Sequence, residues 1–226
     1  RRDFTINAMA YHPKEGLVDL FHGMDDMKNK IIRCVGDPME RFHEDALRIM
    51  RAVRFSAQLG FEIEEQTKAG ISRLTSNLKN VSAERIQAEL VKLLVSPHPD
   101  YLRTAYETGI TKEFLLEFDL CMETEQNTPY HCFTVGEHIL HSLLYVEADK
   151  VLRLTMLLHD IAKPVMKTTD ENGRDHFKRH AAVGEEMSKK ILRRLKFDND
   201  TIEKVSRLIR YHDDRPEGQM RAVRRA

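Results

Sequence analysis

Residues 40–59, ERFHEDALRIMRAVRFSAQL, form the stretch that decides the fold. Apolar side chains recur there at steps of three and four residues, the period of one helix face; they are Ala46, Ile49, Met50, Val53 and Ala57. The other side carries Glu44, Asp45, Arg48, Arg51 and Arg54. Asp37 and Pro38 indicate a helix start upstream, and Gly60 indicates the end. The stretch therefore predicts one amphipathic helix with a broad basic face beside two carboxylates.

Asp45 and Arg48 are three residues apart, so on a helix they would lie on one face, within reach of one flat ligand. A carboxylate accepts hydrogen bonds and a guanidinium donates them. Such an edge complements cytosine and adenine, which present an amine donor beside a ring acceptor, whereas guanine and uracil reverse that order. The alternative is a solvated face with Glu44–Arg48 and Asp45–Arg48 ion pairs, each contributing about 0.3–0.5 kcal/mol. Spacing alone leaves both interpretations open.

Residues 36–61, GDPMERFHEDALRIMRAVRFSAQLGF, closely resemble the neck of the bacterial-type (class II) tRNA nucleotidyltransferase and poly(A) polymerase family. The EDxxR motif of that family corresponds to residues 44–48. The resemblance implies that Asp45 and Arg48 form the protein template for an incoming CTP or ATP. Arg51 and Arg54, on the same basic face, are expected to belong to the nucleotide-binding site.

The composition is that of a globular chain with one or two domains. Of the 226 residues, 32% are charged and 41% hydrophobic. No apolar run is long enough for a membrane helix, and no signal peptide opens the chain. Cys34, Cys121 and Cys132 form no CxxC pair, which argues against a disulfide framework or a zinc knuckle. We therefore expect a cytoplasmic protein without a membrane partner.

Charge is balanced overall but unevenly distributed. The chain has 36 basic and 36 acidic residues. Residues 107–173 hold five Lys/Arg against twelve Asp/Glu, whereas residues 174–226 hold fifteen against nine. The basic C-terminal part could contact the phosphate backbone of tRNA, although solvated helix faces explain such runs as well. The chain begins without a methionine and ends in the helical pattern MRAVRRA, so we expect it to be a fragment.

The first 36 residues mix turns with short elements. Residues 18–21 and 31–35 predict strands, and residues 24–29 predict a short polar helix. The opening RRDFTINA resembles a signature of the nucleotidyltransferase head in the same family. That resemblance implies contacts with the phosphate and ribose of the nucleotide, made by Arg1, Arg2, Asp3 and Asn7. The alternative is a surface turn capped by Asp3. Residues 23–26, GMDD, resemble the flexible connection between head and neck.

Nucleotidyl transfer in this family also needs a pair of carboxylates that hold Mg²⁺. That pair precedes the RRD motif in the family, and nothing in this sequence replaces it. The fragment alone is therefore expected not to transfer nucleotides.

Residues 82–95, SAERIQAELVKLLV, predict the clearest helix after the neck. Ser82 is expected to cap it, and an apolar stripe follows one face, formed by Ile86, Leu90, Leu93 and Leu94. The segment resembles the VSAERIxxEL segment of the same family, in which the region of Glu84 and Arg85 buttresses the neck. A domain boundary is expected near residues 126–129.

Histidines concentrate in the next part of the chain: His131, His138, His141, His159, His176 and His180. Asp160 follows His159 at the end of an almost wholly apolar helix, residues 151–158. A buried Asp–His pair needs partners, and imidazoles with a carboxylate suit Zn²⁺, Mn²⁺ or iron. His176 and His180, four residues apart, could share one helix face. A histidine can also be simply a satisfied polar group, but six with an HD doublet favour a divalent transition metal.

The pattern GEHILHSLL…LLHDIAKP…HFKRHAAVG resembles the HD superfamily of metal-dependent phosphohydrolases, from about residue 130 to the end. The resemblance implies that His138, His159 and Asp160 are metal ligands, that His180 is the extra histidine, and that Lys163 lies near a substrate phosphate. The last aspartate of the motif would be Asp213 or Asp214, beside His212, or a residue beyond Ala226. His176, His212 and Asp213 are additional candidate metal ligands.

The sequence thus predicts a mainly α-helical protein with a small α/β remnant of the head. Its expected parts are the head remnant (1–36), a helical neck and body that binds RNA and nucleotide (37–126), and an HD phosphohydrolase-like domain (127–226). The expected function of the parent protein is the addition of CCA to tRNA 3′ ends from CTP and ATP with Mg²⁺. The alternatives are a poly(A) polymerase, or a non-catalytic RNA- and nucleotide-binding fragment with HD phosphohydrolase activity.

Overall fold

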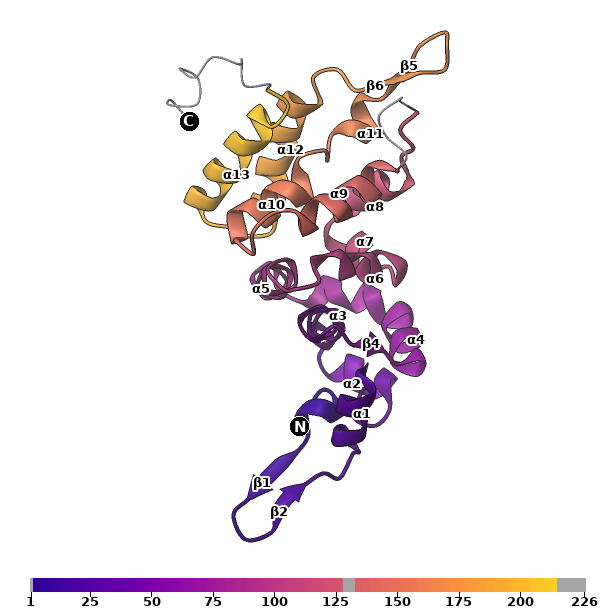
Figure 1. Ribbon diagram of the computed structural model, residues 1–226, viewed down its shortest axis with the longest axis vertical. Helices are drawn as coiled ribbons and strands as arrows, with labels where there is room; N and C mark the ends of the chain where they lie inside the picture. The colour runs from indigo at the N-terminus through magenta and orange to yellow at the C-terminus, as the bar shows by residue number, and fades with distance from the viewer. Residues whose placement is uncertain (1, 128–132, 215–226) are drawn as a thin grey trace.

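A computed structural model describes residues 2–127 and 133–214 (Figure 1). The described part is mostly helical, with short two-stranded pieces of sheet, as the sequence predicts. The molecule is elongated: the N-terminal hairpin lies at one end, and helices α9 to α13 lie at the other (Figure 1). None of the helices in the described part is both long and apolar enough to cross a membrane.

The N-terminal part differs in detail from the predicted strands. It contains η1 (Thr5–Asn7), β1 (Ala10–His12), β2 (Gly16–Val18), α1 (Gly23–Asn29) and β3 (Ile31–Ile32). The strand predicted over 18–21 is wrong beyond Val18, because the Asp19 carboxylate instead accepts the backbone N–H groups of Gly23 and Met24 and starts α1. Residues 23–26, which resemble a flexible connection in sequence, form the first turn of α1, and two of them, Gly23 and Asp26, are buried.

Residues 40–59 form two helices instead of the single predicted one. Helix α2 (Pro38–Glu44) starts at Asp37, whose side chain accepts the Met39 N–H, and α3 (Leu47–Leu59) ends at Gly60, which has φ +66°. Both of those boundaries were predicted. The break comes at Asp45, whose backbone is extended and whose Oδ1 accepts the Leu47 N–H at 3.1 Å. A short acidic side chain that bonds its own neighbouring backbone competes with the helix, and here it ends α2.

Helices α3 and α5 form the centre of the neck and body. The remaining elements are β4 (Glu62–Ile63), α4 (Glu65–Leu74), η2 (Thr75–Asn80), α5 (Ala83–Leu94), η3 (Pro99–Tyr101), α6 (Leu102–Glu107), α7 (Ile110–Phe114) and α8 (Leu116–Glu123). β3 pairs in parallel with β4. The predicted apolar stripe of α5 is buried, but Ser82 makes no side-chain cap, so the predicted capping bond is wrong.

A buried ion pair joins α3 to α5. Arg54 Nε donates to Glu89 Oε2 at 2.8 Å, and the exposed fractions of the two residues are 7% and 3%. The Arg54 guanidinium also lies 3.6 Å from the centroid of the Phe55 ring. Because both charges are removed from water, each depends on the other for compensation.

The C-terminal helices pack as a separate layer. They are α9 (Val135–Leu144), α10 (Lys150–Leu158), α11 (Lys163–Met166), α12 (His180–Arg194) and α13 (Asn199–Tyr211), with β5 (Thr168–Thr169) paired to β6 (Asp175–His176). Gly136 lets α9 approach α8 closely, since a Cβ there would lie 2.6 Å from Met122 Cα. Arg103 Nη2 on α6 donates to Glu137 Oε2 at 2.6 Å and ties α9 to the body.

Two of the three cysteines lie in the described part, and both are buried free thiols. Burial raises the pKa of Cys34 to about 12 and also raises the pKa of Cys121. Both are therefore protonated and unreactive at neutral pH. Cys132 lies outside the described residues.

Asp175 closes the base of the β5–β6 hairpin. Its Oδ2 accepts the Asn127 N–H at 2.8 Å and lies 2.9 Å from Lys167 Nζ, while its Oδ1 accepts the Thr169 hydroxyl. Burial by itself would raise the pKa of this carboxyl, but these hydrogen bonds lower it to about 2. The folded state therefore favours the ionised form of Asp175 over the protonated form.

The first prediction concerns the Arg54–Glu89 pair. The variant Glu89→Ala leaves the Arg54 charge buried and uncompensated, so the free energy of unfolding should fall by about 3–5 kcal/mol. Urea unfolding of the variant and the unmodified chain measures this difference. Glu84→Ala, an exposed position on the same helix, is the control and should change little. Equal stability of Glu89→Ala and the unmodified chain would contradict the assignment.

The second prediction concerns Asp175 and pH. A carboxyl whose pKa is lowered on folding stabilises the native state above its unfolded pKa, and this contribution is lost as pH falls from about 4 to about 2. Asp175→Asn should therefore reduce stability by about 1–3 kcal/mol at pH 7, with the difference shrinking through that acid window. Urea unfolding at several pH values tests this. Asp200→Asn, at an exposed carboxylate on α13, is the control and should reduce stability at pH 7 by less than Asp175→Asn does.

Candidate nucleotide and metal sites

Asp3 joins the head remnant to the neck. Its Oδ2 accepts Arg51 Nε at 2.6 Å, and its Oδ1 lies 3.3 Å from Arg48 Nε. Arg48 also donates from Nη1 to Glu44 at 2.7 Å and to the Arg41 carbonyl at 2.9 Å. Burial by itself would lower the pKa of Arg48, but the hydrogen bond to Glu44 and the nearby carboxylates raise it. The Glu44–Arg48 pair considered from the sequence is therefore present.

Asp45 does not share a helix face with Arg48, so that prediction is wrong. Asp45 lies in the break between α2 and α3, and its side chain turns to α5, where Oδ2 accepts Arg85 Nη2 at 3.0 Å. No hydrogen bond or ion pair is described between the side chains of Asp45 and Arg48, although the charge of Asp45 is among those that raise the pKa of Arg48. Arg85 therefore holds the carboxylate of Asp45, the hydrogen-bond acceptor of the predicted template. This contact agrees with the expectation that the Glu84–Arg85 region supports the neck.

The other predicted nucleotide contacts occupy different surroundings. Arg2 is exposed, whereas Arg54 is committed to Glu89 in the core. The Asn7 side chain accepts the Phe4 N–H at 3.2 Å and so supports the η1 turn. Arg1 lies outside the described residues. The structure therefore brings together Asp3, Arg48 and Arg51, with Asp45 close by, and leaves Arg54 apart.

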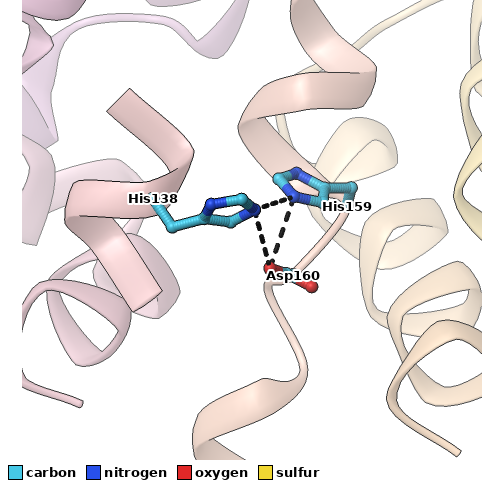
Figure 2. Close-up of side chains that lie close together, drawn as sticks. All are labelled: His138, His159 and Asp160. Carbon is cyan, nitrogen blue, oxygen red and sulfur yellow. Dashed lines mark hydrogen bonds and ion pairs between the residues drawn. The ribbon is translucent and has the colours of Figure 1, made fainter. Parts of the chain in front are cut away.

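The predicted HD residues converge around Asp160. Figure 2 shows His138 pointing from α9 toward His159 and Asp160, which follow α10. Nε2 of His138 and Nε2 of His159 are 3.2 Å apart, and they lie 3.5 and 3.3 Å from Asp160 Oδ2. On the other side of the carboxylate, Oδ1 lies 3.3 Å from Nε2 of His180 and 3.6 Å from Nε2 of His212. Two three-residue groups with metal-ligand spacing therefore share Asp160.

The imidazole orientations fit a metal. Nδ1 of His159, His180 and His212 each lies 2.7–2.9 Å from a backbone carbonyl three residues earlier. A carbonyl only accepts, so each Nδ1 carries the proton and, in the neutral ring, each Nε2 presents its lone pair to the cluster. The Nε2 atoms of His180 and His212 are 3.2 Å apart. Two lone pairs at that distance repel each other unless a cation or a proton lies between them.

Asp160 is a buried carboxylate. Burial would raise its pKa, but the neighbouring imidazoles, with His159 foremost, hold the pKa of Asp160 well below its usual range. Lys163 Nζ lies 2.8 Å from Asp160 Oδ2 and donates to Gln126 Oε1 at 3.0 Å. Lys163, expected near a substrate phosphate, is itself buried beside the cluster.

The additional candidate ligands, His176, His212 and Asp213, separate into two groups. His212 lies in the cluster, and Asp213 Oδ2 lies 3.2 Å from Nε2 of His180, although the Asp213 side chain is 63% exposed. His176 lies outside: it belongs to strand β6, and its Nε2 contacts Asp170 at 2.9 Å. The prediction of one helix face for His176 and His180 is therefore wrong, because α12 begins at His180.

The remaining histidines and aspartates of the pattern do not join the described cluster. The ring of His141 lies against that of Phe133, with the two planes tilted by 31°, and His131 lies outside the described residues. Among the described contacts, none joins Asp214 to the cluster. Three links escaped the sequence analysis: Asp3 to Arg51, Arg54 to Glu89, and Lys163 to Gln126. Each joins residues at least 35 positions apart, so no local pattern indicates it.

Three family models match successive parts of the chain. Residues 1–33 match the poly A polymerase head domain, residues 60–122 match the probable RNA and SrmB-binding site of polymerase A, and residues 128–225 match the HD domain. The order is the one that the sequence motifs predict.

Known proteins show the same relationship. The chain is 54% identical over 176 residues to the CCA-adding enzyme of Ligilactobacillus salivarius (strain UCC118), a match that covers 74% of this chain and 43% of that protein. The fold is similar to the crystal structure of the Bacillus stearothermophilus CCA-adding enzyme in complex with CTP, with a TM-score of 0.64, 28% identity, and coverage of 96% of this chain and 47% of that one.

A third similar structure is the Thermotoga maritima CCA-adding enzyme complexed with tRNA, with a TM-score of 0.53, 25% identity, and coverage of 93% of this chain and 47% of that one. The chain thus spans less than half the length of these relatives. The successive matches, the relatives and the shared fold agree, and the chain belongs to the family of bacterial-type tRNA nucleotidyltransferases and poly(A) polymerases.

Proposed function

We propose that this chain supplies the nucleotide template and RNA-binding body of an enzyme that adds CCA to tRNA 3′ ends from CTP and ATP. The observation that carries the proposal is the cluster of Asp3, Arg48 and Arg51 beside Asp45, in a chain related to CCA-adding enzymes. Structures of similar proteins contain CTP and tRNA, which supports these ligands here. The head (1–36), neck and body (37–126) and HD part (127–226) remain our proposed division.

In this proposal Asp45 accepts the amine proton of cytosine or adenine, and Arg48 donates to the neighbouring ring acceptor. Arg51 and Arg2 face the phosphates, and Asp3 or Asn7 serves the ribose. Mg²⁺ would be held by carboxylates of the head that precede the RRD motif. A poly(A) polymerase remains the alternative, since it shares these motifs; acceptance of CTP as well as ATP favours CCA addition.

The third prediction tests the template. Asp45→Ala and Arg48→Ala should each weaken CTP and ATP binding by about tenfold or more, because each removes a hydrogen bond that involves a charged group. Calorimetric titration of each nucleotide measures this. Arg73→Ala, at an exposed arginine on α4, is the matched control. Circular dichroism verifies that the helices persist, and unchanged affinity in both template variants would refute the assignment.

We propose a second activity for the C-terminal part, metal-dependent hydrolysis of a phosphate ester. The supporting observation is the convergence of four imidazoles on the Asp160 carboxylate, with three Nδ1 protons held by backbone carbonyls. His138, His159 and Asp160 would hold one divalent transition metal, and Asp160, His180 and His212 would hold a second. Such ions polarise phosphoryl oxygens and activate water. Lys163 would steady the charge of the substrate phosphate.

The fourth prediction concerns metal content. His159→Ala and His180→Ala should each reduce the bound transition metal, since each removes a ligand from one of the two groups around Asp160. Elemental analysis of the purified chain after dialysis measures this. His176→Ala is the matched control, because His176 lies outside the cluster and contacts Asp170. Equal metal content in all four proteins would mean that His159 and His180 are structural.

A further inference from the structure

A polar pocket lies beside the proposed template. It has a volume of about 360 Å³ and is formed where the break between α2 and α3 faces the end of η2 and the start of α5. Its lining residues are His43, Glu44, Asp45, Ala46, Asn77, Asn80, Val81 and Arg85. A volume of this size falls in the range of ligand-binding pockets.

The pocket is distinct from the arginine cluster. Asp3, Arg48 and Arg51 are absent from its lining, and Asp45 stands between the two regions because its Oδ2 is held by Arg85. Glu44 likewise bonds Arg48 while contributing to the pocket wall. One side of the Asp45 segment therefore carries the guanidinium groups that suit phosphates, and the other side carries the pocket.

The charge of the lining decides what kind of ligand fits. The charged groups of the wall are already paired with each other or with neighbours, since Glu44 bonds Arg41 and Arg48 and Asp45 bonds Arg85. Because the guanidinium of Arg85 is already bonded to a carboxylate, the wall disfavours a triphosphate tail. It accepts an uncharged group that offers hydrogen-bond donors.

The polar side chains that remain suit a nucleobase. Within the described part, the side-chain amides of Asn77 and Asn80 have no hydrogen-bond partner, and neither has the imidazole of His43. An amide both donates and accepts, so it can pair with the edge of any base. Ala46 and Val81 supply the apolar surface of the wall. Hydrogen bonding at the edges with apolar contact is how proteins hold unstacked bases of single-stranded RNA.

The two walls have different origins. One comes from the EDxxR segment, and the other, residues 77–85, lies within the span that matches the RNA-binding family model. A ligand here thus contacts the template motif and the RNA-binding body at once. We propose that this pocket binds the 3′-terminal nucleoside of the RNA substrate, with Asn77 and Asn80 bonding its base. The inference rests on the proposed function, because it places the acceptor RNA beside the template for the incoming nucleotide.

The test uses the whole chain and an RNA hairpin with a single-stranded 3′ end. The fluorescent base 2-aminopurine is placed either at the 3′ terminus or at an internal position of the single strand. We expect a saturable fluorescence change from the terminal probe and a smaller one from the internal probe. Asn80→Leu, at an exposed position that needs no rearrangement of the core, should weaken RNA affinity by about tenfold, and Asn80→Asp should weaken it as well.

Ser76→Leu is the matched control, because Ser76 is exposed on the same 3₁₀-helix η2 but does not line the pocket. It should bind RNA as the unmodified chain does. Three results would overturn the inference. If both Asn80 variants bind RNA with unchanged affinity, the pocket does not hold the RNA terminus, whereas the proposed function is unaffected. Displacement of the terminal probe by CTP would assign the pocket to the incoming nucleotide. Absence of any RNA binding would overturn the proposed function together with the pocket.

Discussion

The buried ion pair between Arg54 and Glu89 is the constraint on which the neck depends. It fixes α5 against α3, since Glu89 is the only carboxylate paired with Arg54 among the described ion pairs, while the other cation on Glu89, Lys92, belongs to α5 itself. Arg85 lies one helical turn before Glu89, so the same constraint brings its guanidinium to Asp45. The position of Asp45 is thus set in part from outside the α2–α3 segment. The proposed template and the adjoining pocket both depend on a contact between residues 35 positions apart in sequence.

Hydrophobic periodicity predicted α3 and α5 well, because the buried residues of both follow the 3.6-residue period that packing requires. It failed at Asp45 and at Asp19. In both places a carboxylate bonds nearby backbone N–H groups and replaces the expected continuation of a helix or strand. Such bonds leave the apolar spacing untouched: the predicted apolar face begins at Ala46, directly after the break, and nothing in its period marks the end of α2. A residue that can cap a helix, when it occurs inside a periodic stretch, is therefore as informative about the helix boundary as the hydrophobic period is.

The cluster around Asp160 was predictable where the side chain belongs to a strong motif, as for His159 and Asp160. His176 and His212 were both candidate ligands from the sequence, and backbone geometry separates them. His176 is close to His180 in sequence, but Arg179 between them has φ +67° and turns the chain before α12 begins. His212 is 32 residues from His180, yet the lengths of α12 and α13 return it to the same place. Sequence distance misleads whenever two helices fold back on each other.

Asp3 and Asp160 are both carboxylates surrounded by nitrogen donors, but their charge balance differs. Asp3 faces Arg48 and Arg51, two permanent cations, so its charge is compensated at neutral pH. Asp160 faces four imidazoles and Lys163, and an imidazole is mostly neutral at pH 7 when its pKa is ordinary. Burial by itself would lower the pKa of His212, but Asp160, the Ile209 carbonyl and the charge of Asp213 together raise it. Adding protons to all four rings would set like charges 3.2 Å apart. A divalent ion supplies the same positive charge without that repulsion, and this is why the Asp160 cluster suits a metal and the Asp3 cluster suits a nucleotide.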